Sequence, residues 1–88
     1  MVWWFIMFKN RTDDGRNNIV GKNIERLRKN LKEKTSQRQL AEILQMSGLE
    51  VEKNAIQRIE SGERFVTDIE LKIISEVLDV TCDQLLEP

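Results

Sequence analysis

The sequence has few of the residues that catalyse reactions or bind metal ions. Its 88 residues include no histidine and no tyrosine, and the lone Cys82 has no imidazole to activate it. A zinc site would need several Cys or His ligands, so we expect no metal site, no cofactor and no catalytic residue. The sequence therefore predicts a protein that is not an enzyme.

Disulfides and long apolar runs are also missing. A single cysteine cannot form an internal disulfide, which favours a reducing compartment, and we expect the cytoplasm. The longest apolar segment, Met1–Phe8, would rise about 12 Å as a helix, against about 30 Å of bilayer hydrocarbon. It lacks the basic start and cleavage site of a signal peptide. We therefore expect no membrane span, and the aromatic and β-branched content of this segment favours a short strand.

What is present has the composition of one soluble globular domain, with 40% hydrophobic and 33% charged residues. The charges are uneven, because Gly21–Arg64 carries ten basic and seven acidic residues whereas Phe65–Pro88 carries one and six. A basic middle and an acidic end suit a domain that presents one face to a polyanion. An ordinary solvated surface explains the same counts, so the charges alone leave both interpretations open.

Helical periodicity begins at residue 20. The first apolar stripe, at positions i, i+4, i+7 and i+11, consists of Val20, Ile24, Leu27 and Leu31. Capping boxes, in which a Ser or Thr is followed three residues later by Glu or Gln, predict helix starts at Ser36–Gln39, Thr67–Glu70 and Thr81–Gln84. Together with a helix from about Glu52 to Ser61, these signals predict five helices.

Two glycines mark predicted helix ends. Gly48 and Gly62 suit the left-handed residue that closes a helix. In the third helix we expect Ala55, Ile56 and Ile59 to face inward. The apolar residues carried by the other later helices are Leu40, Ala41, Ile43, Leu44, Ile69, Leu71, Ile73, Ile74, Val77, Leu78, Leu85 and Leu86. We therefore expect an N-terminal extension over residues 1–18 and an all-α domain over residues 19–88.

Four stretches of sequence carry a family resemblance. In order, they are IERLR (Ile24–Arg28), SQRQLAEIL (Ser36–Leu44), NAIQRIESG (Asn54–Gly62) and LDVTCDQLL (Leu78–Leu86). Over about residues 20–87 they resemble the lambda-repressor-like (Cro/cI, or xenobiotic-response-element) helix-turn-helix family. The resemblance implies a five-helix DNA-binding domain that regulates transcription. The simplest such function is a repressor that occludes a pseudo-palindromic operator as a homodimer.

The same resemblance implies that the third helix enters the major groove of DNA and presents its N-terminal residues to base edges. Ile56 and Ile59 mark its buried face, so the polar residues between them point outward. Arg and Lys pair well with guanine, and Asn and Gln with adenine. The residues we expect to read bases are Lys53, Asn54, Gln57 and Arg58. An exposed helix face is polar in many proteins that bind no DNA, so this assignment depends on the resemblance.

Four further positions gain expected roles from the resemblance. Gln37 begins the helix before the recognition helix, where it and the free N–H groups can hold a phosphate. Arg64 resembles a basic loop residue that contacts the DNA backbone. Arg28 and Glu60 lie where the family pairs an arginine with a glutamate, which predicts a partly buried ion pair. Gln37 could equally be an ordinary first-turn residue, and Arg64 an ordinary solvated arginine.

Two features depart from the family pattern. Between Leu44 and Ile56 the chain has about five residues more than the usual tight turn, so the angle between the two helices is expected to differ. Glu50, Glu52 and Glu63 stand near the expected DNA face, where acids repel phosphate although they suit a helix N-terminus. We therefore expect modest affinity per domain and a need for dimerisation.

Two other interpretations remain open. The net charge of −1, the acidic last third and the apolar Met1–Phe8 favour a protein-interaction module, such as an antitoxin-like or scaffold protein with the same fold. Met1–Phe8 could also attach the domain to a membrane surface. The partners we expect are double-stranded DNA and a second copy of the chain, against which Met1–Phe8 would pack as a paired strand. Salt separates the interpretations, because DNA binding weakens steeply as salt rises.

Overall fold

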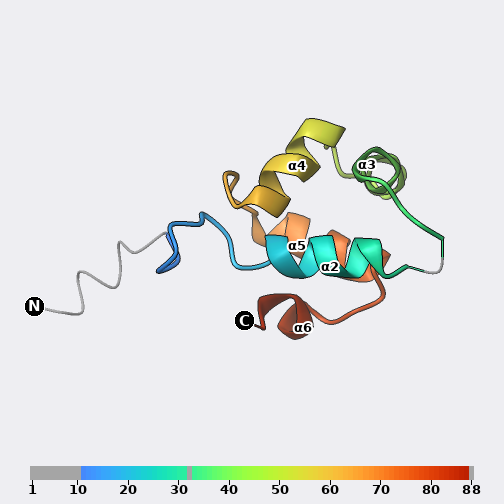
Figure 1. Cartoon of the computed structure of the whole chain (residues 1–88). Coiled ribbons are helices and arrows are strands. Elements are labelled where there is room, and N and C mark those ends of the chain that lie inside the picture. Colours follow the sequence, from blue (N-terminus) through green and yellow to red (C-terminus); the bar gives the residue numbers. More distant parts are fainter. Residues whose placement is uncertain (1–10, 32, 88) are drawn as a thin grey trace, which may run out of the picture.

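The computed structural model describes residues 11–31 and 33–87, and the strand expected near residues 1–8 lies outside them (Figure 1). Within this part of the chain there are five α-helices and no strand. The helices are α2 (Gly21–Lys29), α3 (Gln37–Met46), α4 (Lys53–Ser61), α5 (Asp68–Val77) and α6 (Cys82–Leu86). The predicted all-α, five-helix architecture is confirmed.

Side-chain caps start three of the helices. Ser36, Thr67 and Thr81 each accept a hydrogen bond from the backbone N–H three residues later, and the side chain at that later position bonds back to the cap. All three predicted capping boxes are therefore formed. Gly62 ends α4 with a φ of 88°, and Gly48 follows α3 with a φ of 93°, so both predicted glycines adopt the left-handed conformation.

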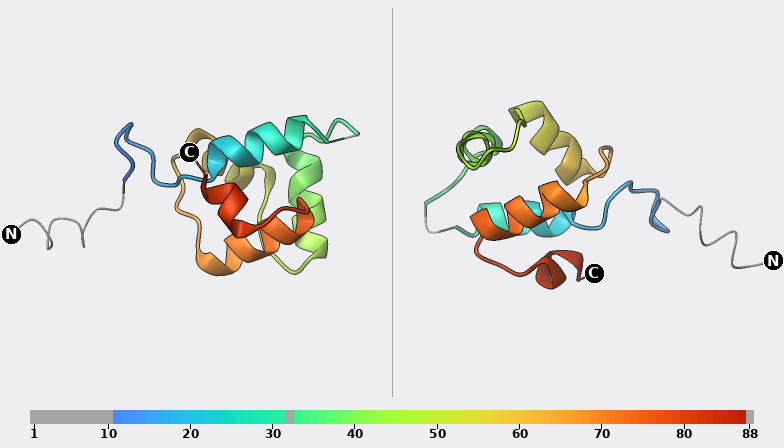
Figure 2. Two further views of the ribbon diagram at one scale, coloured as in Figure 1. Left: turned by 90° about the horizontal axis from the view of Figure 1, so that it is seen from below. Right: turned by 180° about the vertical axis from the view of Figure 1, so that it is seen from behind.

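The helices are arranged so that α4 is accessible from one side. Helices α3 and α4 lie together at one end of the molecule, α6 lies at the opposite end, and α2 and α5 lie between them (Figures 1 and 2). Helix α4 packs against both α3 and α2, whereas α6 packs against α5 and α2. The short helix α6 is therefore remote from the outer face of α4.

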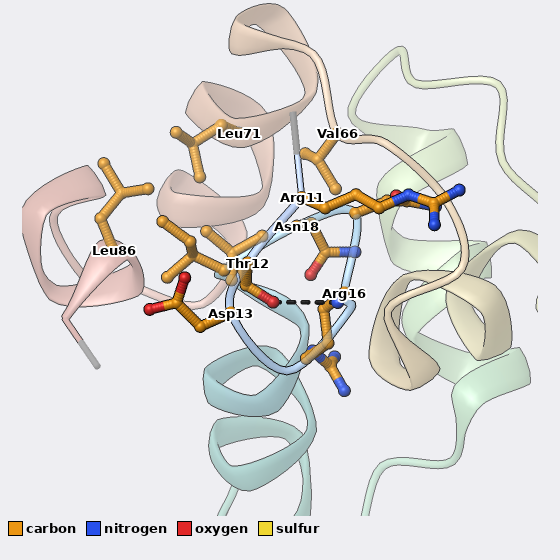
Figure 3. Close-up of a pocket in the computed structure, with 11 residues that line it drawn as sticks. Arg11, Thr12, Asp13, Arg16, Asn18, Val66, Leu71 and Leu86 are labelled. Carbon is orange, nitrogen blue, oxygen red and sulfur yellow. Dashed lines mark hydrogen bonds between the residues drawn. The ribbon is translucent and has the colours of Figure 1, made fainter. Parts of the chain in front are cut away.

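Residues 11–20 approach α2 through a tight turn. The backbone N–H of Thr12 donates to the carbonyl of Arg16 at 2.7 Å, and the N–H of Arg16 donates to Thr12 Oγ1 at 2.9 Å (Figure 3). Asp14 forms an ion pair with Lys22 of α2 at 3.1 Å. This segment also forms part of the wall of an open pocket of about 520 Å³ (Figure 3). Residues 12–18 thus contact the helices directly, while the domain boundary after residue 18 stays a prediction.

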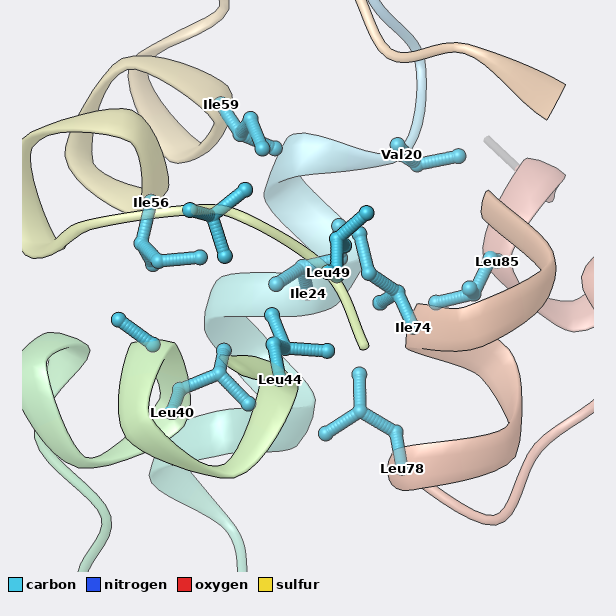
Figure 4. Close-up of a cluster of buried hydrophobic side chains, with 12 residues drawn as sticks. Val20, Ile24, Leu40, Leu44, Leu49, Ile56, Ile59, Ile74, Leu78 and Leu85 are labelled. Carbon is cyan, nitrogen blue, oxygen red and sulfur yellow. The ribbon is translucent and has the colours of Figure 1, made fainter. Parts of the chain in front are cut away.

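One apolar cluster joins the five helices (Figure 4). Its buried members are Val20, Ile24, Leu40, Ala41, Leu44, Leu49, Val51, Ile56, Ile59, Ile74, Leu78 and Leu85. Three apolar residues of the predicted helices are instead substantially exposed, namely Ile43 (41%), Ile69 (69%) and Leu86 (42%). They lie on the outward sides of helices that carry more apolar residues than one buried face accommodates.

Candidate nucleic-acid interface

Helix α4 has one buried side and one exposed side. Ile56 and Ile59 are each 1% exposed and anchor the helix in the core. The four residues expected to read bases, Lys53, Asn54, Gln57 and Arg58, are all exposed. Within the described residues none of these four side chains forms a hydrogen bond or an ion pair. Their polar groups are therefore available to a partner without breaking a contact inside the protein.

The N-terminus of α4 is also open. Glu52 is its N-cap residue and has extended backbone dihedrals, but its side chain accepts no hydrogen bond from the first turn. The free N–H groups of a helix N-terminus, with the positive end of the helix dipole, favour anions. The first turn of α4 can therefore approach a phosphate, although the charge of Glu52 opposes this.

The long turn before α4 is packed into the protein. Leu49 and Val51 are 8% and 3% exposed, and both belong to the apolar core. The side-chain amide of Gln45 donates to the carbonyl of Val51 at 2.6 Å, which ties the turn back to α3. The additional residues thus hold the start of α4 firmly against α3, a role that the sequence pattern did not reveal.

Residues from three elements meet beside the exposed face of α4. Asn54 and Arg58 share an open depression of about 600 Å³ with Arg64 of the following loop, and Glu50 and Glu52 also line it. The depression therefore combines two expected base readers and one expected phosphate contact with two of the acids noted in the sequence.

Arg38 is a cation that sequence reasoning missed. It is exposed in the first turn of α3, and with Lys53 and Asn54 it lines a second depression of about 390 Å³ between α3 and α4. The available signal was its position directly after Gln37 at a helix start, where a positive side chain and free N–H groups act together on an anion.

A buried network connects α2, α3 and α4. Arg28 donates from Nε and Nη2 to the two carboxylate oxygens of Glu60 at 2.7 and 2.9 Å, and from Nη1 to the carbonyl of Thr35 at 2.9 Å. The side chains of Arg28 and Glu60 are only 10% and 2% exposed. The hydrogen bond to Glu60 raises the pKa of Arg28 above its ordinary value. This bidentate pair lies where the sequence places a structural ion pair.

Gln37 takes part in the same network. Its Nε2 donates to Glu60 Oε1 at 2.9 Å, and the side chain is partly buried. One of its donors is therefore used inside the protein. A phosphate would have to be held by its remaining N–H and by the backbone at the start of α3, so the phosphate role of Gln37 stays a prediction.

Arg64 is held by a carboxylate of α5. Its Nη1 and Nη2 donate to the two oxygens of Glu70 at 3.0 and 2.8 Å, and the side chain is 32% exposed. The hydrogen bond from Arg64, with further bonds from Thr67, lowers the pKa of Glu70, and the bond to Glu70 raises the pKa of Arg64. The pairing fixes Arg64 beside α4 and offsets part of its charge, so its phosphate contact also stays a prediction.

Residues 11–31 and 33–87 contain neither a candidate metal site nor a candidate membrane-spanning helix. No group of His, Cys, Asp and Glu side chains there could hold a metal ion. None of the described helices has the length and apolar character needed to cross a membrane.

A helix-turn-helix family model matches residues 24–85, which is more than half of the chain. The chain belongs to the lambda-repressor-like, Cro/cI-type helix-turn-helix family. This membership supports a DNA-binding role in transcription regulation, and regulators of this family are generally not enzymes. Comparison with curated proteins found no match, and neither did comparison with solved structures.

Within the helix-turn-helix motif of this chain, α3 and α4 are the two central helices. In a helix-turn-helix motif the second helix is the recognition helix, and α4 occupies that position here. Gln37 and Arg38 begin the helix that precedes it. On its buried side the motif is held in place by the Arg28–Glu60 pair and by the core residues of both helices.

Proposed function

We propose that this helix-turn-helix domain is a sequence-specific transcriptional repressor that binds a pseudo-palindromic operator as a homodimer, with α4 in the major groove. The observation that carries the proposal is the outer face of α4, where four exposed polar side chains have no partner among the described residues. Polar residues on such a face, next to an open helix N-terminus, suit the base edges and phosphates of duplex DNA. A cytoplasmic location is part of this proposal.

Asn54 and Arg58 are the base readers that we propose first. They are four residues apart on one side of α4 and line the same depression. Each carries the planar or forked donors that recognise adenine or guanine. Lys53 and Gln57 are proposed as neighbouring contacts, because the long turn determines how closely the start of α4 approaches the groove.

Gln37 and Arg64 are proposed to contact phosphates on the two sides of α4. Glu70 holds the guanidinium of Arg64 in place, which lowers the entropy cost of using it, and leaves Nε and one Nη2 proton for a phosphate oxygen. Arg38 adds an exposed charge beside Gln37. Phosphate contacts position the protein but do not select a sequence.

The homodimer follows from the expected weakness of a single domain. Glu50 and Glu52 line the depression that holds Asn54 and Arg58, and their charges oppose the approach of phosphate. Two linked half-sites compensate for weak binding by each domain. The expectation that Met1–Phe8 packs against a second copy concerns residues outside the described part. Deletion of residues 1–10, followed by measurement of mass in solution, tests that expectation.

The test of the proposed function begins with selection of duplexes from a random pool by the wild-type protein. Arg58→Ala and Arg64→Ala are then titrated against a selected and a random duplex over a salt series. We expect Arg58→Ala to cost about 1–3 kcal/mol on the selected duplex and much less on the random one. Arg64→Ala should weaken both duplexes and reduce the salt slope by about one unit. Equal losses for Arg58→Ala on both duplexes would show that α4 does not read bases.

A protein-interaction module is the second candidate, and the exposed apolar side chains favour it. Met46, Ile69 and Phe65 are 88%, 69% and 53% exposed, so these large apolar side chains are accessible to an apolar partner. This candidate predicts that selection enriches no duplex. It also predicts that the protein binds a partner with little dependence on salt.

A further inference from the structure

The C-terminal end of α4 is covered by residues that precede the helix-turn-helix match. Six consecutive backbone carbonyls, from Ile59 to Arg64, accept hydrogen bonds from Arg16, Asn17 and Asn18. We call residues 12–18 the capping segment. Carbonyls at the end of a helix have no partner within it, so an outside donor that reaches them fixes where the helix and the next loop lie.

Each of the three residues covers a different part of this end. The guanidinium of Arg16 donates to the carbonyls of Glu60 and Ser61 at 2.7 and 3.2 Å. Its positive charge also complements the negative end of the α4 dipole. Figure 3 shows Arg16 directed away from the turn that carries it.

Asn17 and Asn18 extend the cover into the loop that carries Arg64. The backbone N–H of Asn17 donates to Gly62 at 2.7 Å, and its side-chain amide donates to Glu63 at 2.8 Å. The amide of Asn18 donates to Ile59 at 3.0 Å and to Arg64 at 2.7 Å. The backbone of Arg64 is therefore fixed from the capping segment, while its side chain is fixed by Glu70.

The capping segment is itself joined to α2 by hydrogen bonds and an ion pair. Its turn is closed by the bonds between Thr12 and Arg16, and Asp14 pairs with Lys22 of α2. The side-chain oxygen of Asn18 accepts from the N–H of Gly21 at 2.8 Å, at the start of α2. The segment thus connects the start of α2 to the C-terminal end of α4.

We infer that the capping segment positions the DNA-binding face, with Arg16 and Asn17 as positioning residues that touch no DNA themselves. This inference deepens the proposed function and rests on it. The fold has other supports, because Ile56, Ile59 and the Arg28–Glu60 pair hold α4 in the core. Water can replace the capping bonds at exposed Ser61 and Glu63, so their loss should loosen the loop without unfolding the domain.

The test compares Arg16→Ala with Arg11→Ala in the full chain. Arg11 is an exposed residue directly before the capping segment, and its substitution removes an equal charge without removing a capping bond among the described residues. Both variants are titrated against a duplex selected by the wild type, at a temperature where circular dichroism shows them fully folded. We expect Arg16→Ala to bind at least about tenfold more weakly than Arg11→Ala.

Asn17→Ala provides a second variant that leaves the net charge unchanged. It removes the bond to Glu63 but keeps the backbone bond to Gly62, and we expect a loss of about two- to fivefold. Amide exchange at Glu63 and Arg64, whose N–H groups bond to the carbonyl of Arg58, should accelerate in both positioning variants.

Several outcomes would overturn the inference. Equal affinities for Arg16→Ala and Arg11→Ala would mean that Arg16 acts only as a charge. Faster exchange with unchanged DNA affinity in Arg16→Ala and Asn17→Ala would mean that the segment only stabilises the loop. A wild-type protein that binds no duplex would overturn the proposed function and this inference together. Normal wild-type binding with unaffected variants would overturn this inference alone.

Discussion

The two ends of α4 differ in how many of their polar groups have hydrogen-bond partners within the described part of the protein. At the N-terminal end, Glu52 gives no side-chain cap, and Lys53 and Asn54 are exposed without partners among the described residues. At the C-terminal end, Gly62 closes the helix in the left-handed conformation, and Arg16 is one of three residues that donate to six successive carbonyls. We call the N-terminal end of α4 the open end. We call the C-terminal end, whose carbonyls are hydrogen-bonded to the capping segment, the closed end.

This difference shows how a short helix can be accessible to a binding partner and still be held in a fixed position. A surface that binds a partner must leave its polar groups unpaired, yet it must hold them within a narrow range of positions. Here the contacts that hold α4 in place lie at its C-terminal end and on its buried side, at Ile59 and Glu60. Exposed polar groups at the open end are hydrated by water and cost little stability.

The largest expected effect comes from removing the ion pair behind the closed end. Arg28→Met leaves the carboxylate of Glu60, 2% exposed, with Gln37 as its remaining side-chain partner. Loss of one member of a buried pair costs about 3–5 kcal/mol, because the other charge remains buried. We expect a decrease of this size in the free energy of unfolding, measured with urea.

Lys29→Met is the matched control, since it makes the same replacement one residue further along α2. Lys29 pairs with Glu25 at 3.4 Å, and the two side chains are 61% and 44% exposed. An exposed pair contributes under about 1 kcal/mol. Similar losses for both variants would contradict the idea that the Arg28–Glu60 pair holds the closed end of α4.

A smaller loss is expected where α2 meets the closed end. A Cβ atom on Gly21 would lie 2.0 Å from the carbonyl oxygen of Ile59, a backbone atom that cannot move alone. Replacing glycine by alanine in a helix usually increases stability, but forced overpacking costs about 1–3 kcal/mol. We therefore expect Gly21→Ala to lower the melting temperature and to weaken binding to the selected duplex.

Gly48→Ala tests whether the crowding is specific to this position. A Cβ on Gly48 would meet no atom within 4 Å, although its φ of 93° imposes a strain of about 1–2 kcal/mol. We expect Gly48→Ala to reduce stability while duplex affinity of the folded protein stays unchanged. If Gly21→Ala also leaves affinity unchanged, α2 does not set the position of the closed end.

Local signals in the sequence predicted much of the fold. The capping boxes at Ser36, Thr67 and Thr81 and the helix-ending glycines depend on residues close in sequence, so they could be recognised without a structure. The exposure of Ile69 could not be predicted in this way, because helical periodicity alone does not show which of several apolar sides of a helix packs against a neighbour.

The closed end of α4 could not be predicted in the same way. Arg16 and Asn17 bond to backbone carbonyls more than forty residues away, and a carbonyl is present at every residue, so no pattern marks the acceptors. The burial of Leu49 and Val51 depends on where α3 and α4 leave space. The bond from Gln37 to Glu60 likewise requires the packed arrangement of two helices.

The smallest expected effect is at the open end and uses two substitutions of Glu52. Glu52→Ser introduces a hydroxyl that can accept from the first-turn N–H groups, whereas Glu52→Gln removes the charge without supplying a favoured cap. We expect the free energy of unfolding of the Ser variant to be about 0.5–1 kcal/mol larger than that of the Gln variant. Urea unfolding of the two proteins measures this difference.

DNA binding should not follow that difference in stability. Both substitutions remove the same acid from the depression that contains Asn54 and Arg58, so both should strengthen binding to selected and random duplexes by a similar factor. The gain should shrink as salt rises, because screening weakens the repulsion that Glu52 exerts on phosphate. A gain confined to Glu52→Ser would mean that fraying of the open end, rather than its negative charge, limits the approach of α4 to DNA.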